Sequence, residues 1–518
     1  MRIIDFFDKG VSDYPDNPAF VEPGSRYTYS EAATETHRIA AAISGHSYPK
    51  GSKIGILAPN CNVAFLTLLG LMRAEGIWLP INPRNSIEMN VDLLHRFEGE
   101  LLFYHSTYER EALQIKAQVP GIRELVLIDA DEGAAISLDE WSRGYESQRF
   151  VTGPERDGDL LALFPTGGTT GLPKSVMMTH KAIETMFANF WAAFSYHDNT
   201  RHLVVAPMTH SSGIMGMAHF ARGGTNYMMI AADPAGILQA VQEYGITHFF
   251  VPPTVLYMML ALPDVRDYDV SSLQHLLVAA APVSLEKLKE AVDVFGPVMT
   301  ECFGQAEAPA AITVKAPRDY LDANGNIIEA RLGSIGRPAA FNVVAILDDE
   351  GIEVPRGERG EICVQGNLVT PGYYNNPQAT AEVREFGWHH TGDIGVQDEE
   401  GFIRIVDRKK DMIITGGFNV FPNEIEQVLM THPDVQDCSV IGVPDEKWGE
   451  AVKAVVQAKP GTKCDEQSLM QLCKEKLGAV KTPKSFDFTE QLPKSPAGKV
   501  LKNELRRAYW QGRGRAVN

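Results

Sequence analysis

A glycine- and threonine-rich stretch, FPTGGTTGLPKS at residues 164–175, has the composition of a loop that holds phosphate groups. From Gly168 it reads Gly, four residues and then Pro-Lys-Ser, where a Walker A loop would have Gly-Lys-Ser/Thr. Pro173 lacks an N–H group and has a fixed φ, so the backbone is not expected to run on into a helix. We therefore expect a mobile phosphate loop of different geometry, with these candidate ligand-binding residues: Thr166, Gly167, Gly168, Thr169, Thr170, Gly171 and Lys174.

The stretch resembles the phosphate loop of the adenylate-forming superfamily, which includes acyl-CoA synthetases, peptide-synthetase adenylation domains and luciferases. The usual pattern is close to TSGTTGxPKG, from which this chain departs at Gly167 and Ser175. Alone, such a stretch is more often a structural turn. Six further segments resemble the family's motifs in the family's order: PMTHSSG at 207–213, AAAPVS at 279–284, ECFGQAEAP at 301–309, WHHTGD at 388–393, DRKKDMIITGGFNVFPNEIE at 407–426 and PKSPAGKV at 493–500.

The resemblance implies a nucleotide site. Adenine would lie against a group of four residues, Ala281, Pro282, Phe303 and Gly304. Asp393 would accept hydrogen bonds from both ribose hydroxyls, and Arg408 would also bind the ribose. Glu307 would hold Mg²⁺ on the phosphates.

The resemblance also implies the residues of catalysis. Lys499 would contact the reacting carboxylate and the α-phosphate, and His210 would border the acyl and thioester sites. Lys410 would be the hinge about which a C-terminal domain rotates, exchanging Lys499 for the glycine loop at Gly416 and Gly417.

Each of these residues also has a structural interpretation. His210 alone would more often be a core histidine, Glu307 or Asp393 a surface or capping carboxylate, and DRKKD an exposed charge run. The ordered set of motifs outweighs these interpretations.

One departure from the motifs is Ala306, which replaces a threonine whose hydroxyl bonds the AMP phosphate in the family. Losing that bond would cost about 1.5–3 kcal/mol.

The implied activity is an ATP-dependent acyl-CoA ligase with ATP, Mg²⁺ and coenzyme A as cofactors and co-substrate. A carboxylic acid would first form acyl-AMP and release pyrophosphate, and the acyl group would then pass to CoA. Positioning and charge neutralisation do most of the work in such transfers. No GxSxG elbow or HExxH motif provides another mechanism.

The acyl group is expected to be an apolar monocarboxylic acid, whether fatty, aryl or alicyclic, because no aspartate near His210 would anchor an α-ammonium group. By resemblance, the acyl site would be lined by Phe187, Phe190, Trp191, Ile214, Met215, Ala279, Ala280, Gly304 and Ala308. Three alternatives stay open. They are transfer to a carrier-protein thiol, luciferase-like oxidation of the adenylate, and a non-catalytic relative that binds nucleotide or acyl-CoA.

The pattern of elements predicts an α/β fold. Short apolar runs such as 53–59, 101–105 and 247–253 alternate with helical stretches such as 181–194, which indicates parallel-rich sheets. From about Leu332, Gly- and Asp-bounded runs indicate a β subdomain. We expect an N-terminal adenylating domain at 1–408, a hinge at 409–411 and a small mobile α+β domain at 412–518.

Composition excludes other classes of function. The net charge of −18 argues against binding to nucleic acid, although residues 410–518 carry 16 Lys/Arg against 14 Asp/Glu, which is compatible with anionic CoA. Six cysteines without a CxxC pair predict reduced thiols. Neither a signal peptide nor a transmembrane segment is expected, so a cytoplasmic location is predicted. A homo-oligomer is a further possibility.

Overall fold

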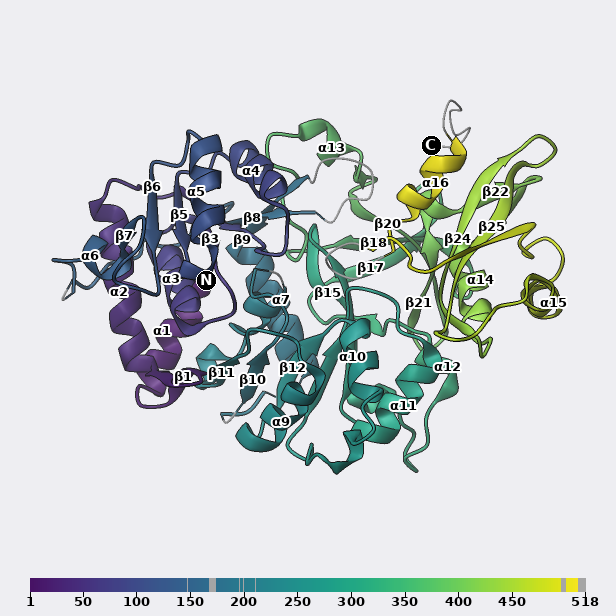
Figure 1. Ribbon diagram of the computed structural model, residues 1–518, viewed down its shortest axis with the longest axis horizontal. Helices are drawn as coiled ribbons and strands as arrows, with labels where there is room; N and C mark the ends of the chain where they lie inside the picture. The colour runs from purple at the N-terminus through teal and green to yellow at the C-terminus, as the bar shows by residue number, and fades with distance from the viewer. Residues whose placement is uncertain are drawn as a thin grey trace.

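The computed structural model describes residues 1–146, 148–166, 174–194, 196–198, 200–209, 211–494 and 500–510. Within these residues the strands form four sheets, with helices packed around them (Figure 1). The fold is mixed α/β, with parallel-rich sheets and a separate C-terminal domain, which confirms the predicted fold class. No helix of the described residues combines the length and the apolar character that a membrane span requires.

Two large sheets build most of the molecule. The nine-stranded sheet has the order β16-β15-β14-β13-β12-β10-β11-β1-β2. Its strands are β1 (Pro18–Glu22), β2 (Ser25–Thr28), β10 (Arg201–Val204), β11 (Thr225–Met228), β12 (His248–Val251), β13 (His275–Val278), β14 (Met299–Gln305), β15 (Ala308–Lys315) and β16 (Arg337–Pro338). The seven-stranded sheet has the order β7-β6-β5-β3-β4-β8-β9. Its strands are β3 (Lys53–Leu57), β4 (Ile77–Pro80), β5 (Leu101–Tyr104), β6 (Glu124–Leu127), β7 (Ile136–Ser137), β8 (Leu160–Pro165) and β9 (Ser175–Thr179).

The helices of this part follow the apolar periodicity of the sequence. They are α1 (Ile3–Asp13), α2 (Tyr29–Gly45), α3 (Asn62–Arg73), α4 (Ile87–Arg96), α5 (Glu109–Gln118), α6 (Leu138–Trp141), α7 (His180–Ala193), α8 (Ser211–Met215), α9 (Pro234–Tyr244), α10 (Pro253–Leu260), α11 (Leu285–Phe295) and α12 (Glu329–Leu332). The Thr179 hydroxyl accepts a hydrogen bond from the Ala182 N–H and so caps α7, the helix expected at 181–194. One apolar core contains side chains from α1, α2, α3 and α7 and from both large sheets, and it joins the sheets into one body.

The smaller sheets follow along the chain. The third has the order β17-β18-β20-β19, with β21 paired to β20, and is the β subdomain expected after Leu332. Its elements are β17 (Val343–Leu347), β18 (Arg359–Gln365), α13 (Pro377–Ala381), β19 (Arg384–Glu385), β20 (Trp388–Gln397) and β21 (Ile403–Arg408). The C-terminal domain contains β22 (Ile413–Thr415), β23 (Phe418–Val420), α14 (Pro422–Leu429), β24 (Val435–Asp445), β25 (Gly449–Ala458), α15 (Glu466–Leu477), β26 (Ser485–Thr489) and α16 (Lys502–Trp510).

The elements around the glycine- and threonine-rich stretch differ from those of a Walker A loop. Strand β8 precedes the stretch and strand β9 follows it, and the two strands pair antiparallel, with Pro165 opposite Ser175. The stretch therefore joins two neighbouring strands of one sheet, whereas a Walker A loop opens a helix. This agrees with the expectation from Pro173 that no helix begins there.

Candidate active site

The base of the predicted phosphate loop is closed by two hydrogen bonds between its flanking residues. The Thr166 N–H donates to the Lys174 carbonyl at 2.8 Å, and the Lys174 N–H donates to the Thr166 hydroxyl at 3.1 Å. Several predicted site residues lie outside the described residues: Gly167, Gly168, Thr169, Thr170, Gly171, His210 and Lys499.

Tyr373 connects Glu307 with Lys174. Its hydroxyl donates to Glu307 Oε1 at 2.5 Å, and the Lys174 ammonium lies 4.7 Å from the centre of its ring. Burial and the Glu307 charge raise the pKa of Tyr373 well above its ordinary value, so the hydroxyl keeps its proton and acts as a donor. The segment at 372–374 runs alongside β9, because the Met177 N–H donates to the Gly372 carbonyl and the Tyr374 N–H to the Ser175 carbonyl. This pairing brings Glu307 close to Lys174, at the C-terminal end of the predicted phosphate loop.

A second cluster surrounds Asp393, which is buried in β20. Arg408 lies opposite it on β21, and Arg408 Nε is 2.6 Å from Asp393 Oδ1. Gln305 donates from Nε2 to Asp393 Oδ2 at 3.1 Å and to the Thr391 carbonyl at 2.6 Å. An arginine and an amide thus fix the orientation of the Asp393 carboxylate. This arrangement suits a carboxylate that must accept hydrogen bonds from a ligand in one defined direction.

The turn between β14 and β15 links the two clusters. Gln305 reaches Asp393, while Glu307, two residues further, reaches Tyr373. Gly304 permits the turn, since a Cβ there would come within 2.4 Å of the Ala310 backbone. Phe303, which precedes it, is half-buried. One short turn therefore places an amide at the predicted ribose site and a carboxylate at the predicted phosphate site.

The predicted adenine turn follows β13. Ala281 is half-buried and Pro282 is exposed. Ala280, which stands where the resembled pattern has glycine, has a φ of +78°. The backbone of this turn thus keeps the left-handed conformation that favours glycine, although its side chain is alanine.

The predicted hinge and the predicted glycine loop lie on either side of β22. Lys410 is in a short 3₁₀ turn at Lys409–Asp411. Loss of solvation lowers the pKa of Lys410, and the cations Arg408 and Arg506 lower it further, although Asp411 opposes them. Gly416 and Gly417 form the two-residue turn between β22 and β23 with φ of +57° and +81°.

The expected acyl-site residues on α7 make core contacts. Phe187 is fully buried and meets Phe6 edge-on, with ring centres 5.3 Å apart. Trp191 also packs against Phe6 and donates from Nε1 to the Ala218 carbonyl at 2.6 Å. The other apolar candidates are buried or half-buried, apart from exposed Ala280: Phe190, Ile214, Met215, Ala279 and Ala308.

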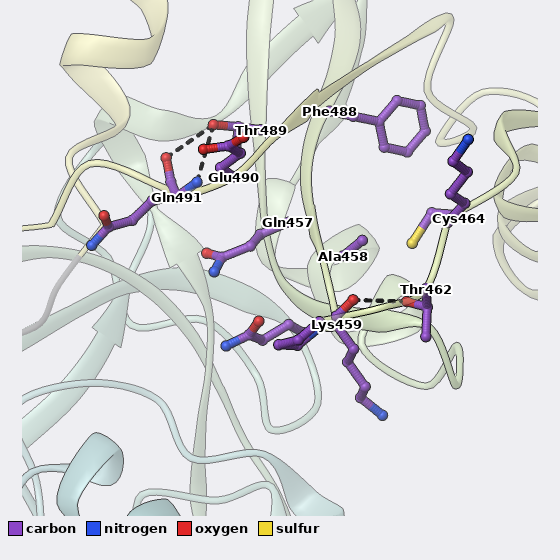
Figure 2. Close-up of a pocket in the computed structure, with 12 residues that line it drawn as sticks. Gln457, Ala458, Lys459, Thr462, Cys464, Phe488, Thr489, Glu490 and Gln491 are labelled. Carbon is purple, nitrogen blue, oxygen red and sulfur yellow. Dashed lines mark hydrogen bonds between the residues drawn. The ribbon is translucent and has the colours of Figure 1, made fainter.

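A cavity of about 860 Å³ lies in the C-terminal domain, at the ends of β25 and β26 (Figure 2). None of the predicted site residues lines it. Its lining consists of Gln436, Gln457, Ala458, Lys459, Pro460, Thr462, Lys463, Cys464, Phe488, Thr489, Glu490 and Gln491. The cavity is therefore separate from the two clusters described above.

The described residues contain no group of three or more His, Cys, Asp or Glu side chains arranged to hold a metal ion. A single carboxylate such as Glu307 still suits Mg²⁺, which keeps several waters and is commonly held by one or two carboxylates together with substrate phosphates. Within the described part of the chain, Glu307 Oε2 accepts no hydrogen bond.

Two members of these clusters, Tyr373 and Gln305, were not among the residues predicted from the sequence. Gln305 lies within the ECFGQAEAP segment, so its proximity to Glu307 could have indicated it. Tyr373 lies in TPGYY at 370–374, outside the quoted motifs.

Comparisons with known proteins agree with the motifs. The AMP-binding enzyme family matches residues 7–374, and the AMP-binding enzyme C-terminal domain matches residues 424–499. The medium/long-chain-fatty-acid–CoA ligase FadD8 of Mycobacterium tuberculosis is 34% identical, over 97% of this chain and 89% of that protein. The feruloyl-CoA synthase of an Amycolatopsis species is 32% identical, over 97% and 99%. ATP-bound MatB of Rhodopseudomonas palustris superposes with a TM-score of 0.87 at 26% identity, over 98% of this chain and 99% of MatB, whereas its apo form gives 0.76.

Proposed function

Because this chain belongs to the AMP-binding enzyme family and is an ATP-dependent acyl-CoA ligase, we propose that it activates an apolar monocarboxylic acid through the two clusters described above. The observation that carries this proposal is the β14–β15 turn, which joins Gln305 and Asp393 to Glu307, Tyr373 and Lys174. A nucleotide bound along this turn would have its ribose at Asp393 and its phosphates at Glu307. ATP and CoA are the co-substrates of such ligases.

In the first half-reaction the substrate carboxylate attacks the α-phosphorus of ATP, and pyrophosphate leaves. Asp393 and Arg408 hold the ribose, and Lys174 neutralises charge on the phosphates. Glu307, oriented by the Tyr373 hydroxyl, would hold Mg²⁺, which when bound supplies positive charge to the pyrophosphate. Lys499 would neutralise the attacking carboxylate, and Ala281, Pro282, Phe303 and Gly304 would contact adenine.

In the second half-reaction the CoA thiol attacks the acyl carbon, and AMP leaves. We propose that the domain at 412–518 rotates at the hinge 409–411, about Lys410, relative to the domain at 1–408. The rotation would bring Gly416 and Gly417 to the site in place of Lys499. His210 would border both the acyl and the thioester sites.

Fatty or aryl acids are the proposed substrates. The names of two relatives suggest this range of acids, since one is a medium/long-chain-fatty-acid–CoA ligase and the other is a feruloyl-CoA synthase. The apolar character of Ile214, Met215 and Ala308, which pack in the core beside the expected acyl site, fits an apolar acyl group. We also propose a cytoplasmic location.

The test is pyrophosphate release across a panel of alkyl, aryl and aryl-alkanoic acids, with and without CoA. Release that depends on the acid, together with acyl-CoA formation, is expected. Lys499→Ala should abolish acyl-AMP formation but leave CoA transfer from supplied acyl-AMP largely intact, while Lys463→Ala should behave as wild type. Pyrophosphate release without acyl-CoA would favour transfer to a carrier-protein thiol, and equal loss of both half-reactions would exclude the proposed role of Lys499.

A further inference from the structure

The residues on both sides of Lys410 are fixed by ion pairs. On the N-terminal side, Lys409 Nζ lies 2.9 Å from Asp349 and 3.2 Å from buried Glu361, which also accepts the Gly392 N–H at 2.9 Å. On the C-terminal side, Asp411 pairs at 2.8 Å with Arg506 of α16, whose side chain is buried. Lys410 is thus the one residue between an anchor on the β subdomain and an anchor on the C-terminal domain.

A separate set of contacts crosses this hinge, where the N-terminus of α14 packs on β18 and β21. The Asn423 N–H donates to Asp407 Oδ2 at 2.7 Å, and Asn423 Nδ2 donates to the Val406 carbonyl at 3.3 Å. Arg359 of β18 pairs with Glu424 at 2.8 Å and lies 5.0 Å from the centre of the Phe421 ring. We call these six residues, Arg359, Val406, Asp407, Phe421, Asn423 and Glu424, the α14 latch.

The α14 latch belongs to one orientation of the C-terminal domain. In the sheet of that domain, β25 separates β22 from β24, the strand on which α14 packs, and Figure 1 shows β22 to the right of β20 and β21. The Gly416 turn beside it packs within its own domain, since the Gly416 N–H donates to the Trp448 carbonyl at 2.8 Å. The glycine loop is therefore remote from Asp393 and Glu307 in this orientation, which superposes better on ATP-bound MatB than on its apo form.

We propose that Arg359 and Asp407 are positioning residues that hold the C-terminal domain in the orientation for adenylation. This inference rests on the proposed function, in which rotation at Lys410 separates the half-reactions. Rotation there moves Asn423 and Glu424 away from Asp407 and Arg359, so each catalytic cycle must break and re-form the α14 latch. Weakening it favours the other orientation at the expense of this one.

The first test measures the two half-reactions separately in Arg359→Ala and Asp407→Asn, at pH 8, where Asp407 is ionised although burial raises its pKa to about 6. Loss of the ion pair and the ring contact should slow acyl-AMP formation about fivefold in Arg359→Ala. CoA transfer from supplied acyl-AMP should be unchanged or faster. An equal decrease in both half-reactions, or no change in either, overturns the proposal.

The matched control is Arg331→Ala. Arg331 pairs with Glu400 at 2.9 Å and lies 4.7 Å from the centre of the Phe402 ring, so it makes the same two kinds of contact as Arg359. Both partners, Glu400 and Phe402, lie N-terminal to the hinge, so these contacts do not cross it. This variant should keep the wild-type balance between the half-reactions.

A second readout does not depend on activity. Trypsin can cut after Arg408, Lys409 and Lys410, and a released hinge should be cut several-fold faster in Arg359→Ala than in wild type or Arg331→Ala. Equal rates of cleavage would overturn the α14 latch even in an active ligase. Failure of wild type to release pyrophosphate with any acid would instead count against the proposed function, and the cleavage assay would still decide the latch.

Discussion

Ala280 adopts a φ of +78° in the turn that follows β13, a conformation that costs an alanine about 1–2 kcal/mol more than a glycine. Ala280→Gly should therefore stabilise the protein by about 1 kcal/mol after the greater flexibility of glycine in the unfolded chain is subtracted. We expect a small rise in melting temperature, of about 1–2 °C, measured by differential scanning calorimetry.

The control is Ala279→Gly. Ala279 is the preceding residue, and its φ is not in the left-handed region. Glycine there adds freedom to the unfolded chain and removes a methyl group that packs against the core, so this variant should melt below wild type. If both glycine variants lower the melting temperature, the turn at Ala280 stores no backbone strain.

Tyr373 orients the carboxylate that we propose to hold Mg²⁺. Tyr373→Phe removes the donor to Glu307 Oε1 but keeps the ring beside Lys174. The loss of one hydrogen bond to a charged group should raise the Mg²⁺ concentration needed for half-maximal pyrophosphate release about tenfold. A titration of Mg²⁺ at saturating ATP measures this shift.

Tyr374→Phe is the matched control for this titration. The Tyr374 hydroxyl donates to exposed Glu98 at 2.9 Å, so its removal has no route to Glu307. We expect a wild-type Mg²⁺ requirement. An unchanged requirement in Tyr373→Phe as well would show that Glu307 is positioned without the tyrosine.

At the scale of elements, local chemistry made part of the candidate site predictable. Pro173 indicated that no helix follows the phosphate loop, and β9 follows it. The WHHTGD and DRKKD motifs indicated Asp393 and Arg408, which face each other across β20 and β21. The first prediction needed only the chemistry of proline. The second rested on the resemblance of two short segments to the motifs of the family.

Contacts between distant segments were not predictable in this way. Tyr373 meets Glu307 across 66 residues because the 372–374 segment pairs with β9, and no periodicity within either segment encodes that pairing. Phe187 was expected to line the acyl site, and it packs against Phe6 of α1. Apolar spacing predicts which side of a helix is buried, and it leaves open whether core or ligand covers it.

The β22–β23 hairpin is the element to test for CoA transfer. A Cβ on Gly416 would come within 2.6 Å of the Trp448 ring, and the φ of +57° is unfavourable for alanine. Gly416→Ala should distort the turn and slow CoA transfer from supplied acyl-AMP at least tenfold, while acyl-AMP formation stays near wild type. Single-turnover measurements of each half-reaction check this.

Gly461→Ala separates a distorted hairpin from a weakened domain. Gly461 also has a positive φ, +79°, in a turn of the C-terminal domain, and a Cβ there meets no atom within 4 Å. Its replacement adds backbone strain without a collision beside the hairpin. CoA transfer should stay normal in this variant, and equal defects in the two variants would contradict a specific role for the Gly416 turn.

For the whole molecule, a set of buried histidines links stability to pH. His202, His248 and His275 lie side by side on β10, β12 and β13, and the His219 ring is 5.4 Å from that of His202. Burial lowers the pKa of His202 and His275 to about 4 and the pKa of His219 and His248 well below its ordinary value. All four are therefore neutral in the folded protein at pH 5 to 7.

The unfolded chain binds protons at these histidines as the pH falls below about 6.5, whereas the folded protein does not. The free energy of unfolding should therefore decrease from pH 6.5 towards pH 4, by up to about 1.4 kcal/mol per pH unit for each histidine.

His219→Leu removes one such group without breaking a side-chain hydrogen bond within the described residues, since neither ring nitrogen has a partner there. Melting temperatures between pH 7 and 5 should fall less steeply in this variant than in wild type. His95→Leu, at an exposed histidine, should keep the wild-type slope, and identical slopes in all three proteins would show that the buried histidines do not set the acid sensitivity.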